Sequence, residues 1–213
     1  MTRLRKTVRI RGLTLVELAI ASFLFLLVLG LTSAALSSGV KSYLSVRSEV
    51  ELQQDALAIL SRITREVGEA DPGTTWPPPT ADTTLIPPGP DPVGIVFSSP
   101  RDGSGRLSLD PATKKPRWHK RICYLFDPST RQLFRGTQDL AAVSATPPPL
   151  DPTLTTDWFR TNAPMDPLPG RVESFEIKVG NSTSSFDFNV VVSSSSQGYK
   201  TRVQFLGHAT MNP

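Results

Sequence analysis

Cysteine and histidine are scarce in this chain of 213 residues, which contains one cysteine, Cys123, and two histidines, His119 and His208. A single cysteine excludes an internal disulfide, so packing must hold the fold together, and we expect Cys123 to lie in that packing. Neither histidine has another ligand at metal-site spacing, and no glycine-rich phosphate loop follows a predicted strand. We therefore predict no catalytic residue, no metal site and no cofactor, and we expect that the chain is not an enzyme.

Acidic residues are absent before Glu17, and proline is absent before Pro72, so all 20 prolines lie between Pro72 and the C-terminus. The first eleven residues carry five positive charges, at Arg3, Arg5, Lys6, Arg9 and Arg11. This excess of positive charge favours a cytoplasmic N-terminus. The lack of proline permits one uninterrupted helix as far as residue 70.

A long uncharged segment, Leu18–Val40, follows the basic start. As a helix it would measure about 34 Å, which exceeds the roughly 30 Å of a bilayer's hydrocarbon core. We therefore predict a single membrane-spanning helix over residues 13–40, in contact with membrane lipid. The residues that we assign to this membrane helix are Leu18, Phe23, Phe25, Leu27 and Leu31.

The formal charge of the chain, +4, depends on this basic start. If the leader before residue 13 is removed, 23 − 5 = 18 basic residues remain against 19 acidic ones, which leaves a net charge of −1. Binding to nucleic acid needs a basic surface, so we do not expect nucleic acid as a partner.

Glu17 is the residue that separates three interpretations of the N-terminal segment. One is a secretory signal peptide cleaved near Ser33–Ala35, and a second is a plain signal anchor with the charge near the membrane interface. The acid weighs against the signal peptide, because a carboxylate at the start of the apolar run is costly unless it finds a partner, whereas a signal anchor would tolerate it by snorkelling to the interface.

The third interpretation is a resemblance carried by Gly12, Leu13, Thr14, Leu15, Val16 and Glu17. These residues, between a basic leader and an apolar helix, resemble the class III signal of type IV prepilins and pseudopilins. The resemblance implies that a prepilin peptidase cleaves after Gly12 and that Leu13 becomes the N-methylated first residue. Leucine stands here where the family usually has phenylalanine.

The resemblance also implies a role for Glu17 in assembly. Cleavage would give Leu13 a new α-amino group, and in this family that amine meets the glutamate of a neighbouring helix. Because unpaired charges are costly in lipid, such pairing would set the axial register of a filament. The implied partners are other minor and major pilins or pseudopilins and the inner-membrane assembly platform. The implied location is the inner membrane with a periplasmic head, and later the filament.

The rest of the chain predicts an α+β fold. We expect the helix to continue over residues 41–70 as an amphipathic segment whose apolar stripe packs on a β-rich head, residues 71–213. The stripe comprises Tyr43, Val46, Val50, Leu57, Leu60, Ile63 and Val67. Two proline-rich connections, 71–92 and 145–170, interrupt the head, and Trp76 and Trp158-Phe159 are expected to anchor them on the core.

Alternating apolar residues predict antiparallel strands in the head. Val93–Ser98 and Gly105–Leu109 are expected to form a hairpin, and Trp118–Phe126 turns at 127–130 into a strand at 132–135. The basic cluster around His119 is expected to be a solvated edge. Three further runs, at 175–179, 186–192 and 199–205, predict an antiparallel meander.

The order of these elements resembles the J-type minor pseudopilins of type II secretion and the W-type minor pilins of type IV pili. This resemblance implies a subunit at the tip of a filament or in the initiation of its assembly. It leaves open whether the filament is a pilus or belongs to a secretion system. Alternatives of other kinds are a secreted or anchored β-rich binding domain or hydrolase, and a pilin for DNA uptake.

Overall fold

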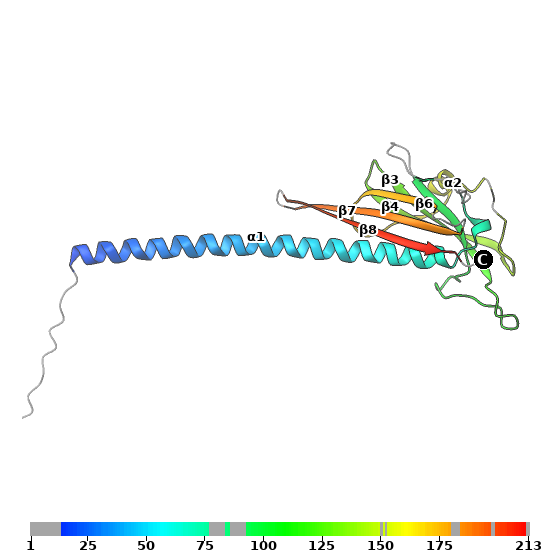
Figure 1. The fold of residues 1–213 in the computed structure, drawn as a ribbon, viewed down its shortest axis with the longest axis horizontal. Coiled ribbons are helices and arrows are strands. Elements are labelled where there is room, and N and C mark those ends of the chain that lie inside the picture. The colour runs from blue at the N-terminus through cyan, green and yellow to red at the C-terminus, as the bar shows by residue number, and fades with distance from the viewer. Residues whose placement is uncertain are drawn as a thin grey trace, which may run out of the picture. The chain divides into compact units, whose positions relative to one another are not determined.

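The computed structural model describes residues 14–76, 84–85, 93–149, 151, 153–179, 184–196 and 199–211. The leader 1–12 and Leu13 lie outside the described residues. The chain divides into two compact units, Met1–Val46 and Arg47–Pro213, of which the second is the head unit. Helix α1, Leu15–Gly68, contributes to both units, and the predicted α+β fold is confirmed (Figure 1).

The head unit contains two four-stranded sheets in which every pair of neighbouring strands is antiparallel. One has the order β1-β6-β7-β8 and the other β2-β3-β4-β5. The first comprises β1 Thr84–Leu85, β6 Val172–Val179, β7 Ser185–Ser196 and β8 Tyr199–Thr210. The second comprises β2 Val93–Ser99, β3 Trp118–Asp127, β4 Gln132–Ser144 and β5 Met165–Pro167. A short 3-10 helix, Pro72–Thr74, and helix α2, Thr156–Asn162, complete the unit.

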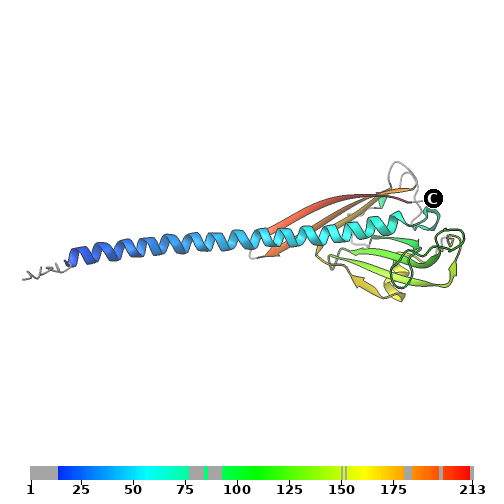
Figure 2. The ribbon, with the colours of Figure 1, turned by 90° about the horizontal axis from the view of Figure 1, so that it is seen from below.

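The main core lies where the last turns of α1 meet both sheets. Figure 2 shows the β2–β5 sheet, in green and yellow, and the β6–β8 strands, in orange and red, on either side of this end of the helix. One cluster of buried side chains joins the three layers, and its α1 members follow a helical spacing. They are Leu52, Ala56, Ile59, Leu60, Ile63 and Val67.

The other face of the β2–β5 sheet is covered by α2 and by the segment that precedes it. Phe159 of α2 is fully buried against Cys123 and Leu125 of β3, and Trp158 packs on the same cluster. Thr155 caps α2, because its hydroxyl accepts the Trp158 N–H. The anchor predicted at Trp158-Phe159 is confirmed, while the helix and β5 within the connection 145–170 were not predicted.

Strand β2 has a different partner from the predicted one. It pairs along its whole length with β3, whereas Gly105–Leu109 makes only isolated bridges, Arg101 to Leu107 and Leu109 to Pro116. The turn itself exists, since Gly105 N–H donates to the Asp102 carbonyl. The predicted hairpin is therefore wrong because the side chains of β2 are buried on both faces, which suits pairing with the central strand β3.

The buried side of α1 is also shifted from the predicted stripe. Leu60, Ile63 and Val67 are buried as expected, but Val50 and Leu57 are exposed. Tyr43 and Val46, in the first unit, are exposed as well. The expectation that the whole stripe packs on the head is wrong.

The basic cluster around His119 is not an edge. Strand β3 lies between β2 and β4, and Lys120 is buried with its ammonium donating to the Asp102 carbonyl at 2.8 Å. Burial lowers the pKa of Lys120, and the positive charge of Arg135 lowers it further. The prediction of a solvated edge was based only on the positive charges of this cluster. It is wrong because the long stem of a lysine can lie along apolar surface while its ammonium still forms a hydrogen bond.

Candidate functional site

The first turn of α1 is closed by a reciprocal pair, Thr14 and Glu17. The Glu17 carboxylate accepts the Thr14 backbone N–H and the Thr14 hydroxyl, each at 2.9 Å, and the Thr14 hydroxyl accepts the Glu17 N–H at 3.3 Å. This arrangement is a capping box, which satisfies backbone donors that a helix start otherwise leaves free. The T-x-x-E spacing in the sequence is the signal for such a cap, which was not predicted.

The capping box has a consequence for the predicted cleavage site. Its donors and acceptors belong only to Thr14 and Glu17, and both residues follow the bond between Gly12 and Leu13. Loss of the leader would therefore leave these hydrogen bonds in place. Gly12 and Leu13 themselves lie outside the described residues, so the predicted cleavage and methylation sites stay predictions.

Helix α1 is long and apolar enough to cross a membrane, and its most apolar stretch is wholly exposed. The five residues that we assign to the membrane helix are all exposed: Leu18, Phe23, Phe25, Leu27 and Leu31. Exposed side chains of this size are costly in water and favourable in lipid. Membrane anchoring by one helix is consistent with this surface.

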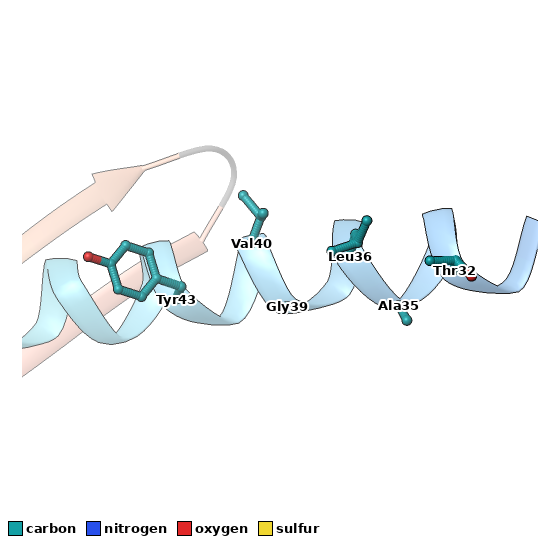
Figure 3. Close-up of a pocket in the computed structure, with 6 residues that line it drawn as sticks. All are labelled: Thr32, Ala35, Leu36, Gly39, Val40 and Tyr43. Atoms are coloured by element: carbon teal, nitrogen blue, oxygen red, sulfur yellow. The ribbon is translucent and has the colours of Figure 1, made fainter. Parts of the chain in front are cut away.

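Small residues form a shallow groove on α1 within the first unit. It has a volume of about 520 Å³ and is bordered by Thr32, Ala35, Leu36, Gly39, Val40 and Tyr43. Figure 3 shows Gly39 without a side chain between Leu36 and Tyr43. The Thr32 hydroxyl donates to the Val28 carbonyl at 2.7 Å, so its polar group is satisfied within the helix. Small residues at such positions let another helix approach closely in lipid.

A buried carboxylate, Glu66, joins α1 to the β2–β5 sheet in the head unit. It accepts the Tyr124 hydroxyl at 2.7 Å, and it binds the Arg135 guanidinium through contacts of 3.0 and 3.1 Å. Arg62 adds a longer contact of 3.4 Å. Burial raises the pKa of Glu66, but the hydrogen bonds and charge of Arg135, with the Tyr124 hydroxyl, outweigh burial and hold it below its ordinary value.

A second pair, Glu69 and Arg101, lies one turn further along the chain. The Arg101 Nε donates to Glu69 at 2.7 Å, and a second guanidinium nitrogen binds the other carboxylate oxygen. Such two-point contacts fix geometry as well as charge. Together with Glu66 they fix the end of α1 against the β2–β5 sheet.

Cys123 lies on the face of β3 covered by α2 and is fully buried. Burial raises the pKa of its thiol to about 12, so the reactive thiolate is scarce at neutral pH. The prediction that this cysteine is a packing residue is confirmed.

His208 takes part in a row of polar groups across the β6–β8 sheet. Its Nδ1 lies 2.7 Å from Asp187 and its Nε2 lies 3.2 Å from the Thr210 hydroxyl. An acid, an imidazole and a hydroxyl in line can relay a proton, but the histidine and aspartate side chains are 59% and 56% exposed. Asp187 and His208 are direct cross-strand neighbours, so the row is explained by strand pairing.

Within the described part of the chain, no three His, Cys, Asp or Glu side chains converge as a metal site would require. In the structure Thr14 forms hydrogen bonds with Glu17, and Arg135 and Tyr124 form hydrogen bonds with Glu66. His119 and His208 lie on different sheets.

Comparison with known proteins gives no assignment. No family model matches the chain, and no curated protein and no solved structure matches it either.

Proposed function

We propose that this chain is a minor pilin or pseudopilin, a subunit of a type IV pilus or of a type II secretion filament. In this role a prepilin peptidase matures the chain after Gly12, and the subunit acts at the tip or in the initiation of assembly. The observation that carries the proposal is Glu17, an acid placed at the start of an exposed, apolar helix of membrane-spanning length.

The capping box supports this role because it pre-positions the Glu17 carboxylate at the helix start. One carboxylate oxygen, Oε2, holds both contacts with Thr14. The other oxygen accepts no bond from a described residue, so the carboxylate retains acceptor capacity for a cation. In the proposed filament that cation is the α-amino group of a neighbouring subunit.

The role also explains the charge on either side of the cleavage site. The basic leader would hold the precursor's N-terminus in the cytoplasm, and the head, residues 71–213, would lie in the periplasm. The partners in the proposal are the prepilin peptidase, other pilins or pseudopilins and the assembly platform. Incorporation follows once the leader is removed.

Two substitutions of Glu17 test the proposal. Glutamine at N3 still completes a capping box, whereas alanine does not, and neither carries a negative charge. We expect both Glu17→Gln and Glu17→Ala to reach the membrane and to be lost from filaments. The measurement is immunoblotting of membrane and sheared filament fractions.

A variant of Thr14 provides the matched control. Thr14→Ser keeps the hydroxyl of the capping box and the charge of Glu17, and we expect it to enter filaments. Normal incorporation of Glu17→Gln would show that the charge is dispensable and would overturn the proposal. Normal export of every variant with no filament fraction would favour the secreted binding domain.

A further inference from the structure

A row of residues on the head half of α1, which we call the ridge, has its acidic residues grouped before its two adjacent arginines. Its members follow one another at spacings of three and four, so they share one side of the helix, separate from the buried stripe. They are Arg47, Glu51, Asp55, Ala58, Arg62 and Arg65. Two acids are thus followed, after the small residue Ala58, by two arginines.

The two arginines border an open groove of about 370 Å³ in the head unit. Ala58 and Ser61 of α1 line it, and Leu168 and Pro169 border it on the other side. The small residues leave room for a second surface to approach, and the apolar wall lowers the local dielectric constant around an incoming charge. A guanidinium pair in such a groove suits carboxylates.

The arginines have donors to spare. Arg62 makes its 3.4 Å contact with Glu66 through Nε, and its side chain is 43% exposed. Arg65 is exposed and forms no ion pair with any residue that the structure describes. A planar guanidinium with free nitrogens binds a carboxylate at two points.

The acids that would fit the groove are on the same ridge of the same chain. The midpoint of Glu51 and Asp55 lies about 16 Å along the helix from the midpoint of Arg62 and Arg65, at 1.5 Å per residue. Two parallel helices that are shifted by this amount bring the acids of one against the arginines of the other. Parallel helices in register would place arginine opposite arginine, which is repulsive.

We propose that the Arg62–Arg65 groove binds the Glu51–Asp55 segment of a second copy of this chain. The contact joins two different patches, so it is heterologous. Because both patches lie on one side of the helix, it joins a pair of copies. It rests on the proposed filament role, because that role places parallel helices in one membrane. It adds to that role a specific contact between head units and an axial shift.

Disulfide trapping with the full chain in detergent micelles tests the proposal. Ser61 lies in the groove, and Val50, eleven positions earlier, is exposed beside the acids. We expect a copy with Ser61→Cys and a differently tagged copy with Val50→Cys to form a mixed disulfide under mild oxidation. The native Cys123 does not compete, because it is fully buried and its thiol pKa is raised to about 12.

Charge variants make the test specific. Adding Arg65→Glu to the Ser61→Cys copy should lower the yield of mixed disulfide about tenfold, and Glu51→Arg in the other copy should restore it. Arg106→Glu is the matched control, because Arg106 is also exposed without an ion pair in the described region, and it should change the yield less than twofold. Salt at 0.5 M should lower the yield, since exposed pairs are screened.

Three outcomes would overturn the proposal: a predominance of Ser61→Cys homodimers, equal effects of Arg65→Glu and Arg106→Glu, or no mixed disulfide at all. Disulfide formation with another pilin-like subunit and not with a second copy would also overturn it. A mature chain that starts at Leu13 but shows no mixed disulfide keeps the filament role and loses only this contact. A chain that starts elsewhere loses the filament role, whatever disulfides form.

Discussion

Removing the Glu66 carboxylate should be among the most destabilising single changes in the head unit. Glu66 is 3% exposed, and the side chain of its partner Arg135 is 11% exposed. Glu66→Ala would leave the Arg135 charge buried without a counter-ion and the Tyr124 hydroxyl without its acceptor. Breaking a buried pair in this way costs about 3–5 kcal/mol.

The cost translates into a measurable shift of the melting temperature. For a domain of 150–250 residues, each kcal/mol lowers Tm by roughly 2–4 °C, so Glu66→Ala should lower it by about 6–20 °C. Tyr124→Phe, which removes only one charged hydrogen bond, should cost about 1.5–3 kcal/mol. The measurement is thermal unfolding of the full chain in detergent, followed by near-ultraviolet circular dichroism.

A double replacement separates the charge from the packing. Glu66→Leu with Arg135→Met removes both charges and keeps apolar volume, and such exchanges are often neutral or stabilising. We expect its Tm to lie much closer to that of the wild type than Glu66→Ala does. If Glu66→Ala unfolds within 2 °C of the wild type, or if the double variant is the less stable, the account of this site is wrong.

The pH dependence has a defined sign. The pKa of Glu66 is lower in the folded chain than its ordinary value of 4.5, so the unfolded chain binds the proton more readily. The stability that Glu66 contributes is therefore complete above about pH 4.5 and is lost as the pH falls through the folded pKa. Glu66→Gln should lack this share of the acid destabilisation, which melting curves between pH 3 and pH 7 would reveal.

Three further predictions concern other parts of the chain. Cys123 should resist alkylation at pH 8 in the folded chain and react fully in denaturant; fast labelling of the native protein would contradict its burial. Gly94→Ala should destabilise the head unit by about 1–3 kcal/mol or more, because the new Cβ would lie 2.3 Å from the Tyr124 carbonyl oxygen, whereas Gly103→Ala meets nothing within 4 Å and should be tolerated. Equal melting temperatures of the two glycine variants would refute this packing. Phe159→Ala should cost about 3–5 kcal/mol, since this ring of α2 is fully buried against Cys123 and Leu125; a cost below 1 kcal/mol would contradict its role as an anchor.

The sequence predicted the parts of the fold that depend on local patterns. The 3.6-residue spacing and the lack of proline predicted one helix over residues 13–70, close to the observed Leu15–Gly68. Strict alternation placed β3 and the meander of β6, β7 and β8, and apolar positions such as Phe175, Phe186 and Phe188 are buried as expected.

The parts that were missed depend on contacts distant in sequence. A charge pattern cannot predict that Glu66 will bind Arg135, because the two residues are 69 positions apart in the sequence. The partner of β2 was missed for the same reason, because a nearby turn favoured a local hairpin while burial on both faces selected β3. Helix α2 was not predicted because the connection 145–170 is rich in proline, although Thr155 and Asp157 are typical of a helix start.

One of the two residues of the N-terminal site, Glu17, could be predicted from the sequence. Glu17 was identified from its cost in an apolar segment, but its partner Thr14 was missed because the expected partner was the amine of a neighbouring subunit. The T-x-x-E spacing is a local signal and predicts the observed bonds. The proposed pairing of Glu17 with the α-amino group of a neighbouring subunit is compatible with this cap, because the cap uses only one of the two carboxylate oxygens.

The N-terminal residue of the protein recovered from membranes is the measurement that bears most directly on the proposed function. Intact-mass spectrometry and Edman sequencing of the full-length product determine it in one experiment. We predict a chain that begins at Leu13, with an added methyl group on its amine. A chain that keeps its first twelve residues within filaments, or one that begins near Ala35, would contradict the account.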